Sequence, residues 1–169
     1  MKLVLAMMMG LSLTAYGQQK DVHASPAEPH SDMVKRGDHA MGFSHETTTH
    51  HFRLFKDGGA IEVEANNPAD KASRDEIRMH LSHIAEMFAA GNFNVPMFIH
   101  DTTPPGAPVM KERRDLIHYR FHETEAGARV RIQTADKQAL MAVHEFLKFQ
   151  IAEHHTGDRT EITNDSGGN

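Results

Sequence analysis

The chain contains the same order of predicted elements twice, and this internal repeat limits the folds that are open to it. The first unit spans residues 47–91 and the second spans residues 115–156. In each unit, a run of β-branched and aromatic residues leads to a turn signal, an alternating run and an amphipathic stretch. Each unit therefore predicts two strands followed by a helix.

The first unit carries the clearer signals. Residues 47–55 end at a lysine-aspartate-glycine-glycine sequence at residues 56–59, which is typical of a hairpin turn. Ser73 opens a capping box, and Gly91 has the position of a glycine stop. We expect a return strand after the turn and a helix between Ser73 and Gly91.

The second unit repeats this order over residues 116–132, and its helix is expected over about residues 136–155. Two such units predict an α+β domain. Its sheet would be four-stranded and mainly antiparallel, with two helices packed on one face. We expect a single domain over residues 45–157.

The first seventeen residues have the pattern of a secretory signal peptide. Lys2 precedes an apolar run at residues 3–13, and the small residues Ala15 and Gly17 define a cleavage position. The apolar run is too short to span a bilayer. We therefore expect an exported protein, periplasmic or extracellular, without a membrane span.

Three further segments lack the periodicity of packed elements. Residues 18–44 are polar and contain proline and glycine, and we expect a flexible arm there. Residues 91–109 predict a long irregular loop, a length at which loops of compact domains are often functional. Residues 158–169 are polar and predict a disordered tail.

The composition excludes several functions. The chain has 18 lysine and arginine residues, 23 aspartate and glutamate residues and a formal charge of −5, without a basic block, which argues against a nucleic-acid partner. It has no cysteine, so covalent c-type haem is excluded. The common hydrolase and phosphate-loop motifs are also missing. We therefore assign no catalytic residue and favour a non-enzymatic role. Acid–base catalysis of the hydrolase or cyclase kind, by a histidine with Asp101 or Glu86, stays open as an alternative that no spacing favours.

Histidine and methionine are abundant, with 14 and 11 copies, and three of them share one stripe of the first helix. His80, His83 and Met87 are three, four and seven residues apart, which places them within about 60° of helix surface. Imidazole and thioether ligands suit copper or haem iron. By strand alternation His50 faces this helix, and His100 in the long loop could supply a further ligand.

A weaker set of candidates has simpler structural explanations. The set is His39, Met41, Met97, His51, His118 and His144. His51 and His118 have the outward phase of their strands, where cross-strand charge pairing explains the sequence. If that sheet face joined two molecules, a homodimer with a shared histidine cluster would result.

Four segments of the chain are characteristic when taken together. They read R-G-D-H-A-M-G-F at residues 36–43, T-T-H-H-F at residues 48–52, P-M-F-I-H at residues 96–100 and V-H-E-F-L at residues 143–147. With these segments the chain resembles a family of small exported bacterial proteins of unassigned function. The resemblance covers residues 34–158 and implies no activity.

The sequence thus predicts an exported copper-binding protein with His50, His80, His83, Met87 and His100 as ligands. Because protonated imidazole does not coordinate a metal, copper affinity should fall below about pH 6. One alternative is a protein that binds b-type haem non-covalently through His80, His83 and Met87. Another is a dimeric structural or interaction module without a cofactor.

Overall fold

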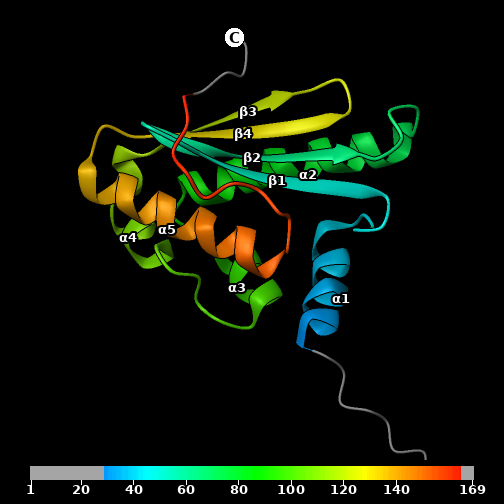
Figure 1. Cartoon of the computed structure of the whole chain (residues 1–169), viewed down its shortest axis with the longest axis horizontal. Coiled ribbons are helices and arrows are strands. Elements are labelled where there is room, and N and C mark those ends of the chain that lie inside the picture. Colours follow the sequence, from blue (N-terminus) through cyan, green and yellow to red (C-terminus); the bar gives the residue numbers. More distant parts are fainter. Residues whose placement is uncertain (1–28, 165–169) are drawn as a thin grey trace, which may run out of the picture.

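A computed structural model describes residues 29–164 and shows one sheet with helices packed against it (Figure 1). In these residues the strands pair antiparallel in the order β1-β2-β4-β3. The strands are β1 (Thr48–Phe55), β2 (Gly58–Ala65), β3 (His118–Glu123) and β4 (Gly127–Gln133). The helices are α1 (Pro29–Met41), α2 (Lys71–Ala89), α3 (Asn94–His100), α4 (Ala107–Glu112), the 3-10 helix η1 (Arg114–Leu116) and α5 (Lys137–Glu153).

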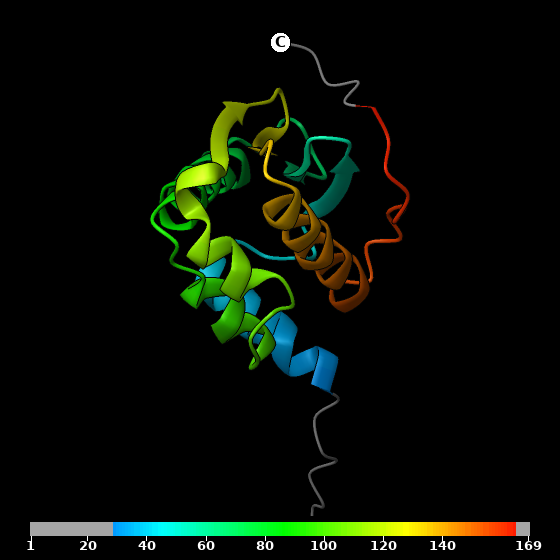
Figure 2. The same ribbon diagram turned by 90° about the vertical axis from the view of Figure 1, so that its left-hand side faces the viewer.

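The predicted α+β class and the antiparallel four-stranded sheet are confirmed. The order strand, strand, helix occurs twice, as β1-β2-α2 and β3-β4-α5. Helix α2 packs mainly on β3 and β4, whereas α5 packs on β1 and β2. Each helix therefore covers the hairpin of the other unit. In Figures 1 and 2, α1, α3 and α4 lie on the side of the molecule away from the strands.

Strand alternation and helical spacing build the core. The buried strand residues that face the helices are Phe52, Leu54, Ile61, Val63, Val130 and Ile132. The helix residues that pack against them are Ile77, Leu81, Ile84 and Phe88 of α2 and Val143, Phe146 and Leu147 of α5. His50 has the same strand phase as Phe52 and Leu54, so it points to this inner face.

Aspartate residues begin both central helices. The Asp70 carboxylate accepts the Ser73 backbone N–H at 3.2 Å, and Asp136 accepts the Ala139 N–H at 2.8 Å. Ser73 is therefore not the capping residue that the sequence pattern predicted. It lies buried in the first turn of α2, and its hydroxyl donates to Asp70 at 2.7 Å. The charged carboxylate is the stronger acceptor for the free N–H groups of the helix start.

The flexible arm expected over residues 18–44 is wrong for its second part. Residues 29–41 form α1, and Met33 and Phe43 are buried. The Arg36 Nε donates to the Ile99 carbonyl at 2.9 Å and ties α1 to α3. The helix has few apolar residues, so its order depends on contacts from distant parts of the chain. Residues 18–28 and the expected signal peptide lie outside the described residues.

The irregular loop expected over residues 91–109 is also corrected, because this segment contains α3 and the start of α4. Pro96 lies in the first turn of α3, and Pro108 lies at the start of α4. Proline is tolerated in the first turn of a helix because no backbone N–H bond is needed there. The prolines that indicated a loop therefore mark two helix starts.

The disordered tail expected over residues 158–169 is ordered up to residue 164; residues 165–169 lie outside the described residues. The Asp158 carboxylate accepts the Phe52 backbone N–H and contacts His51 Nδ1, both at 2.9 Å. The Thr163 N–H donates to the Leu54 carbonyl at 2.9 Å. This segment therefore covers the free edge of β1, where unpaired backbone groups would otherwise be exposed.

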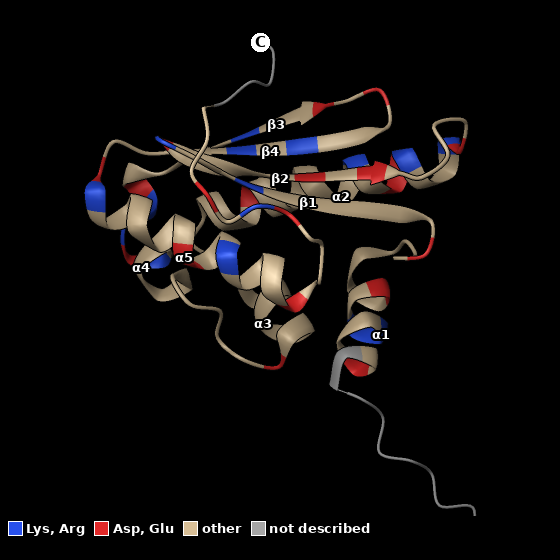
Figure 3. Ribbon diagram, viewed as in Figure 1, with Lys and Arg blue, Asp and Glu red and all other residues tan. Residues whose placement is uncertain are grey.

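The outer sheet face carries paired charges, as the sequence indicated. Glu62 on β2 lies 2.7 Å from Arg53 on β1 and 3.2 Å from Arg129 on β4. Figure 3 shows acidic positions of β2 beside basic positions of β4. This face is separated from the inner histidines by the sheet itself. None of the described helices is long and apolar enough to cross a membrane.

We expect Asp158→Ala to destabilise the fold by about 1–2 kcal/mol, because the buried Phe52 N–H loses its acceptor. Denaturant unfolding measures the change, and hydrogen exchange should show faster exchange at Phe52. Glu161→Ala, an exposed change in the same segment, is the control. Equal stability of the two variants would contradict the role given to Asp158.

Candidate functional site

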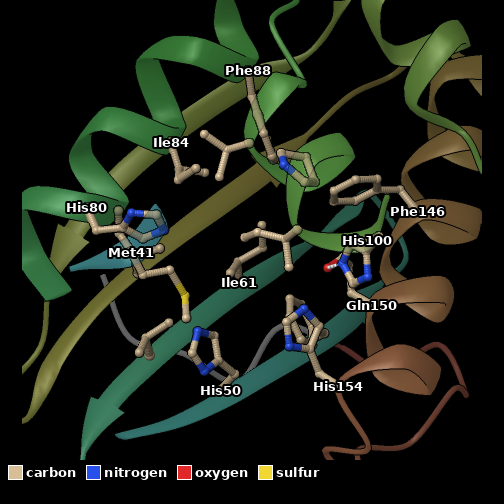
Figure 4. A pocket seen from close by; sticks show the side chains of 16 residues that line it. Met41, His50, Ile61, His80, Ile84, Phe88, His100, Phe146, Gln150 and His154 are labelled. Atoms are coloured by element: carbon tan, nitrogen blue, oxygen red, sulfur yellow. Dashed lines mark hydrogen bonds between the residues drawn. The ribbon is translucent and has the colours of Figure 1, made fainter. Parts of the chain in front are cut away.

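A mostly apolar cavity of about 60 Å³ lies between the inner sheet face and the helices (Figure 4). Ile61, Ile84, Phe88 and Phe146 form part of its wall. One water molecule needs about 10–15 Å³ of such space. The cavity can therefore hold a few water molecules or a small bound group.

Polar and sulfur-bearing side chains from five elements or their ends meet at this cavity. They are Met41 from the end of α1, His50 from β1, His80 from α2, His100 from the end of α3, and Gln150 and His154 from α5 and its C-cap. Four imidazoles around an apolar space are unusual, because a buried polar group loses its hydration.

His50 is half-buried and packs among aromatic rings. Its ring stacks between Phe43, at 6.0 Å between centroids, and His154, at 5.7 Å. Burial, followed by the nearby His80, lowers the pKa of His50 from 6.5 to about 4. The side chain is therefore neutral at pH 7, and one ring nitrogen keeps a free lone pair.

His80 meets the same aromatic ring from α2. Its ring is perpendicular to that of Phe43, with centroids 5.6 Å apart. Burial, and to a smaller degree His83, lowers the pKa of His80 to about 4. His50 and His80 are thus two neutral imidazoles that contact one buried phenyl ring.

Met41 completes this end of the cavity. In Figure 4 its side chain lies between the rings of His80 and His50, with the sulfur toward His50. Met41 is the last residue of α1, so its place depends on the contacts of α1 with α2 and α3. A thioether and two neutral imidazoles are therefore grouped by three elements that are distant in sequence.

His100 lies at the other end of the cavity. Its Nε2 is 3.0 Å from Gln150 Oε1, and its ring is perpendicular to that of His154 at 5.0 Å between centroids. Its Nδ1 has no hydrogen-bond partner among the described residues and lies 3.9 Å from Glu153 Oε2. Burial lowers the pKa of His100 and outweighs the opposite effects of Gln150 and Glu153.

The imidazoles follow one another along the cavity and do not converge on one point. Within residues 29–164, no three histidine, aspartate or glutamate side chains are placed to hold a metal ion together. A metal site here therefore needs the Met41 sulfur, a rotation of side chains, or both.

Three of the five ligands predicted from the sequence line the cavity, namely His50, His80 and His100. His83 is exposed, and Met87 packs half-buried against the core away from the cavity. At about 100° per residue, His80 is nearest to the buried stripe around Leu81 and His83 is farthest from it. His80, His83 and Met87 therefore lie on one stripe of α2, but only His80, at the side of the stripe next to the core, lines the cavity.

The weaker candidates divide in the same way. Met41 lines the cavity. His39 and His118 are exposed, and Met97 is 39% exposed. The His51 side chain contacts Asp158. His144 Nε2 contacts the carbonyl oxygens of Phe55 and Gly58 at 2.9 and 3.0 Å. Apart from Met41, these residues have structural roles or face solvent.

Sequence reasoning missed His154 and Gln150. The signal was present, because Phe146, Gln150 and His154 are spaced by four residues and Phe146 belongs to the apolar stripe of α5. His154 follows the last residue of α5, a position where a cationic histidine also interacts favourably with the helix dipole. The cavity shows that the buried face of α5 extends through this residue.

Comparisons of the chain with models of protein families, with curated proteins and with solved structures find no match. The function must therefore be argued from the cavity itself.

We expect stability to fall as the pH is lowered from about 6.5 to 4. The folded-state pKa of His50 and of His80 lies below the unfolded value, so the unfolded chain binds more protons in this range. Each histidine contributes up to about 3 kcal/mol. Thermal unfolding as a function of pH measures the loss.

His80→Leu should reduce this pH dependence, whereas His83→Leu, a change of the same type at an exposed position of α2, should leave it unchanged. Parallel pH profiles for the two variants would show that His80 is not buried in its neutral form.

Proposed function

We propose that the protein binds a copper ion at the Met41 end of the cavity, with Met41, His50 and His80 as ligands. The observation that carries the proposal is the grouping of one thioether and two neutral imidazoles in a buried, largely apolar space. The three side chains would have to rotate to face one ion, because they do not converge on one point as they stand. The proposal includes the expectation from the sequence that the protein is exported to the periplasm or the extracellular space.

The ligand types favour copper over harder ions. Thioether sulfur is a soft ligand that selects Cu(I), and imidazole binds copper well in either oxidation state. Magnesium and calcium need oxygen ligands, and none of these three residues offers one. Copper is therefore preferred to zinc, which gains little from the sulfur.

The proposed ligand set differs from the one predicted from the sequence. His83 and Met87 are no longer proposed as ligands, because they do not line the cavity. The same applies to His100, because its Nε2 is 3.0 Å from Gln150 Oε1 and its Nδ1 lies beside Glu153. Met41 is proposed in their place.

Haem is the less favoured ligand. A haem group needs far more space than about 60 Å³, so the sheet and helices would have to separate. A single copper ion is small enough for a cavity of this volume. The cavity therefore supports the copper proposal over b-type haem.

We expect His80→Leu to weaken copper binding by about 100-fold or more, because removal of a ligand costs at least as much as removal of a group that orients one. Competition with a chromophoric Cu(I) chelator under anaerobic conditions measures the affinity. Met41→Leu should weaken Cu(I) more than Cu(II), since the thioether is the soft ligand.

The matched control is His83→Leu, which removes an exposed histidine three residues away on the same helix. Its affinity should equal that of the unchanged protein. If His83→Leu loses copper while His80→Leu retains it, the cavity is not the binding site.

We also expect copper binding to persist to lower pH than an exposed histidine site would allow. Protonation of His50 and His80 competes with the metal only as the pH approaches about 4. Copper affinity should therefore stay nearly constant from pH 7 to about 5 and then fall, rather than fall below about pH 6. A Cu(II) titration in weakly coordinating buffers tests this, and half-loss near pH 6.5 would contradict it.

A further inference from the structure

A second cavity, called the outer cavity below, shares part of its wall with the cavity described above, called the inner cavity. Its volume is about 280 Å³, and Met41, His50 and His154 belong to its wall as well as to that of the inner cavity. Asp38 and His45 also line it. The shared residues therefore lie between a mostly apolar cavity and a larger, more polar one.

Asp38 and His45 form a fixed pair in this outer cavity. His45 Nδ1 lies 3.2 Å and 3.0 Å from the two carboxylate oxygens of Asp38, and the His45 backbone N–H donates to the same carboxylate at 3.0 Å. The side chain of His45 is 45% exposed, and that of Asp38 is 33% exposed. Two contacts from the ring and one from the backbone to the same carboxylate hold the imidazole in one orientation, although it remains open to water.

This pairing determines which ring nitrogen is available. An ionised carboxylate only accepts hydrogen bonds, so His45 Nδ1 carries the proton and Nε2 carries the lone pair. No described residue bonds to Nε2. A carboxylate behind a histidine whose other nitrogen is free is the usual support for a metal-binding imidazole.

The end of α1 places this pair close to the inner ligand. Asp38 and Met41 are three residues apart on the same helix face, about one turn or 5 Å along the axis. Gly42, with φ of +83°, ends α1 and donates its N–H to the Asp38 carbonyl at 3.0 Å. The chain then turns back so that His45 reaches Asp38.

We propose that His45, oriented by Asp38, is an entry site that takes a divalent copper ion from water before the ion reaches Met41 and His50. This inference rests on the proposed function for the inner copper site, to which the ion would move. The entry site itself consists of other residues, His45 and Asp38. The negative carboxylate attracts the cation, and imidazole nitrogen replaces one of its water ligands. The ion keeps its oxidation state throughout.

The first experiment tests the entry site without the inner one. Protein with Met41→Leu and His80→Leu should retain one weak Cu2+ site, visible by electron paramagnetic resonance as a nitrogen-coordinated species. Adding His45→Gln should abolish this signal. Adding His39→Gln instead should not, because His39 is an exposed histidine on the same helix that does not line the outer cavity.

The second experiment measures uptake by the protein with its inner site intact. Transfer of Cu2+ from a chromophoric chelator should be about tenfold slower for His45→Gln and for Asp38→Asn. The equilibrium affinity should change less than about twofold, because an entry site alters the rate and not the final state. Asp32→Asn, an aspartate on the same helix outside the cavity, is the control for Asp38→Asn. Thermal unfolding of each variant confirms that it is folded.

The outcomes separate the two proposals. If the Met41→Leu, His80→Leu protein binds no Cu2+, or if His45→Gln changes neither the weak site nor the uptake rate, the entry-site proposal is wrong, whereas the inner-site proposal is not affected. If the unchanged protein binds only one weak Cu2+ ion that His45→Gln removes, the proposed inner site is wrong and the entry site stands.

Discussion

The pairing of β2 with β4 is the interaction on which the rest of the structure depends. It joins the two strand-strand-helix units into one sheet, with Ile61 opposite Val130. Because each helix covers the hairpin of the other unit, α2 and α5 share one sheet face. Arg78 of α2 reinforces this arrangement by donating to the carbonyls of Thr124 and Gly127 at 2.8 and 3.1 Å. The cavity lies between the two helices.

The cavity carries an energetic cost that the fold does not require. Apolar residues at the positions of His50 and His80 would pack without losing the hydration of an imidazole. Burial instead keeps both side chains neutral over most of the physiological pH range. Polar groups that weaken a core are expected mainly where function needs them. The inner cavity, with Met41 beside these rings, is the part of the molecule that most needs a functional explanation.

Local sequence signals and long-range contacts contributed differently to the site. Strand alternation correctly placed His50 on the inner face, because the side-chain period of a strand is fixed by its backbone. Helical spacing placed His80, His83 and Met87 on one stripe, but the angular position of the core decided that only His80 lines the cavity. His154 joined the cavity because α5 stays buried to its end, which no local pattern indicated strongly.

The sequence by itself determined the two units, the antiparallel sheet and the inward phase of His50, since these follow from backbone periodicity and turn chemistry. Only the tertiary structure decided that α1 is ordered and brings Met41 to the cavity. Its anchoring contact joins Arg36 to Ile99, 63 residues apart, and has no local signature. The same holds for Asp158, which reaches Phe52 across 106 residues. Contacts of this kind depend on where the sheet and helices place distant segments, so they can be found only in the folded chain.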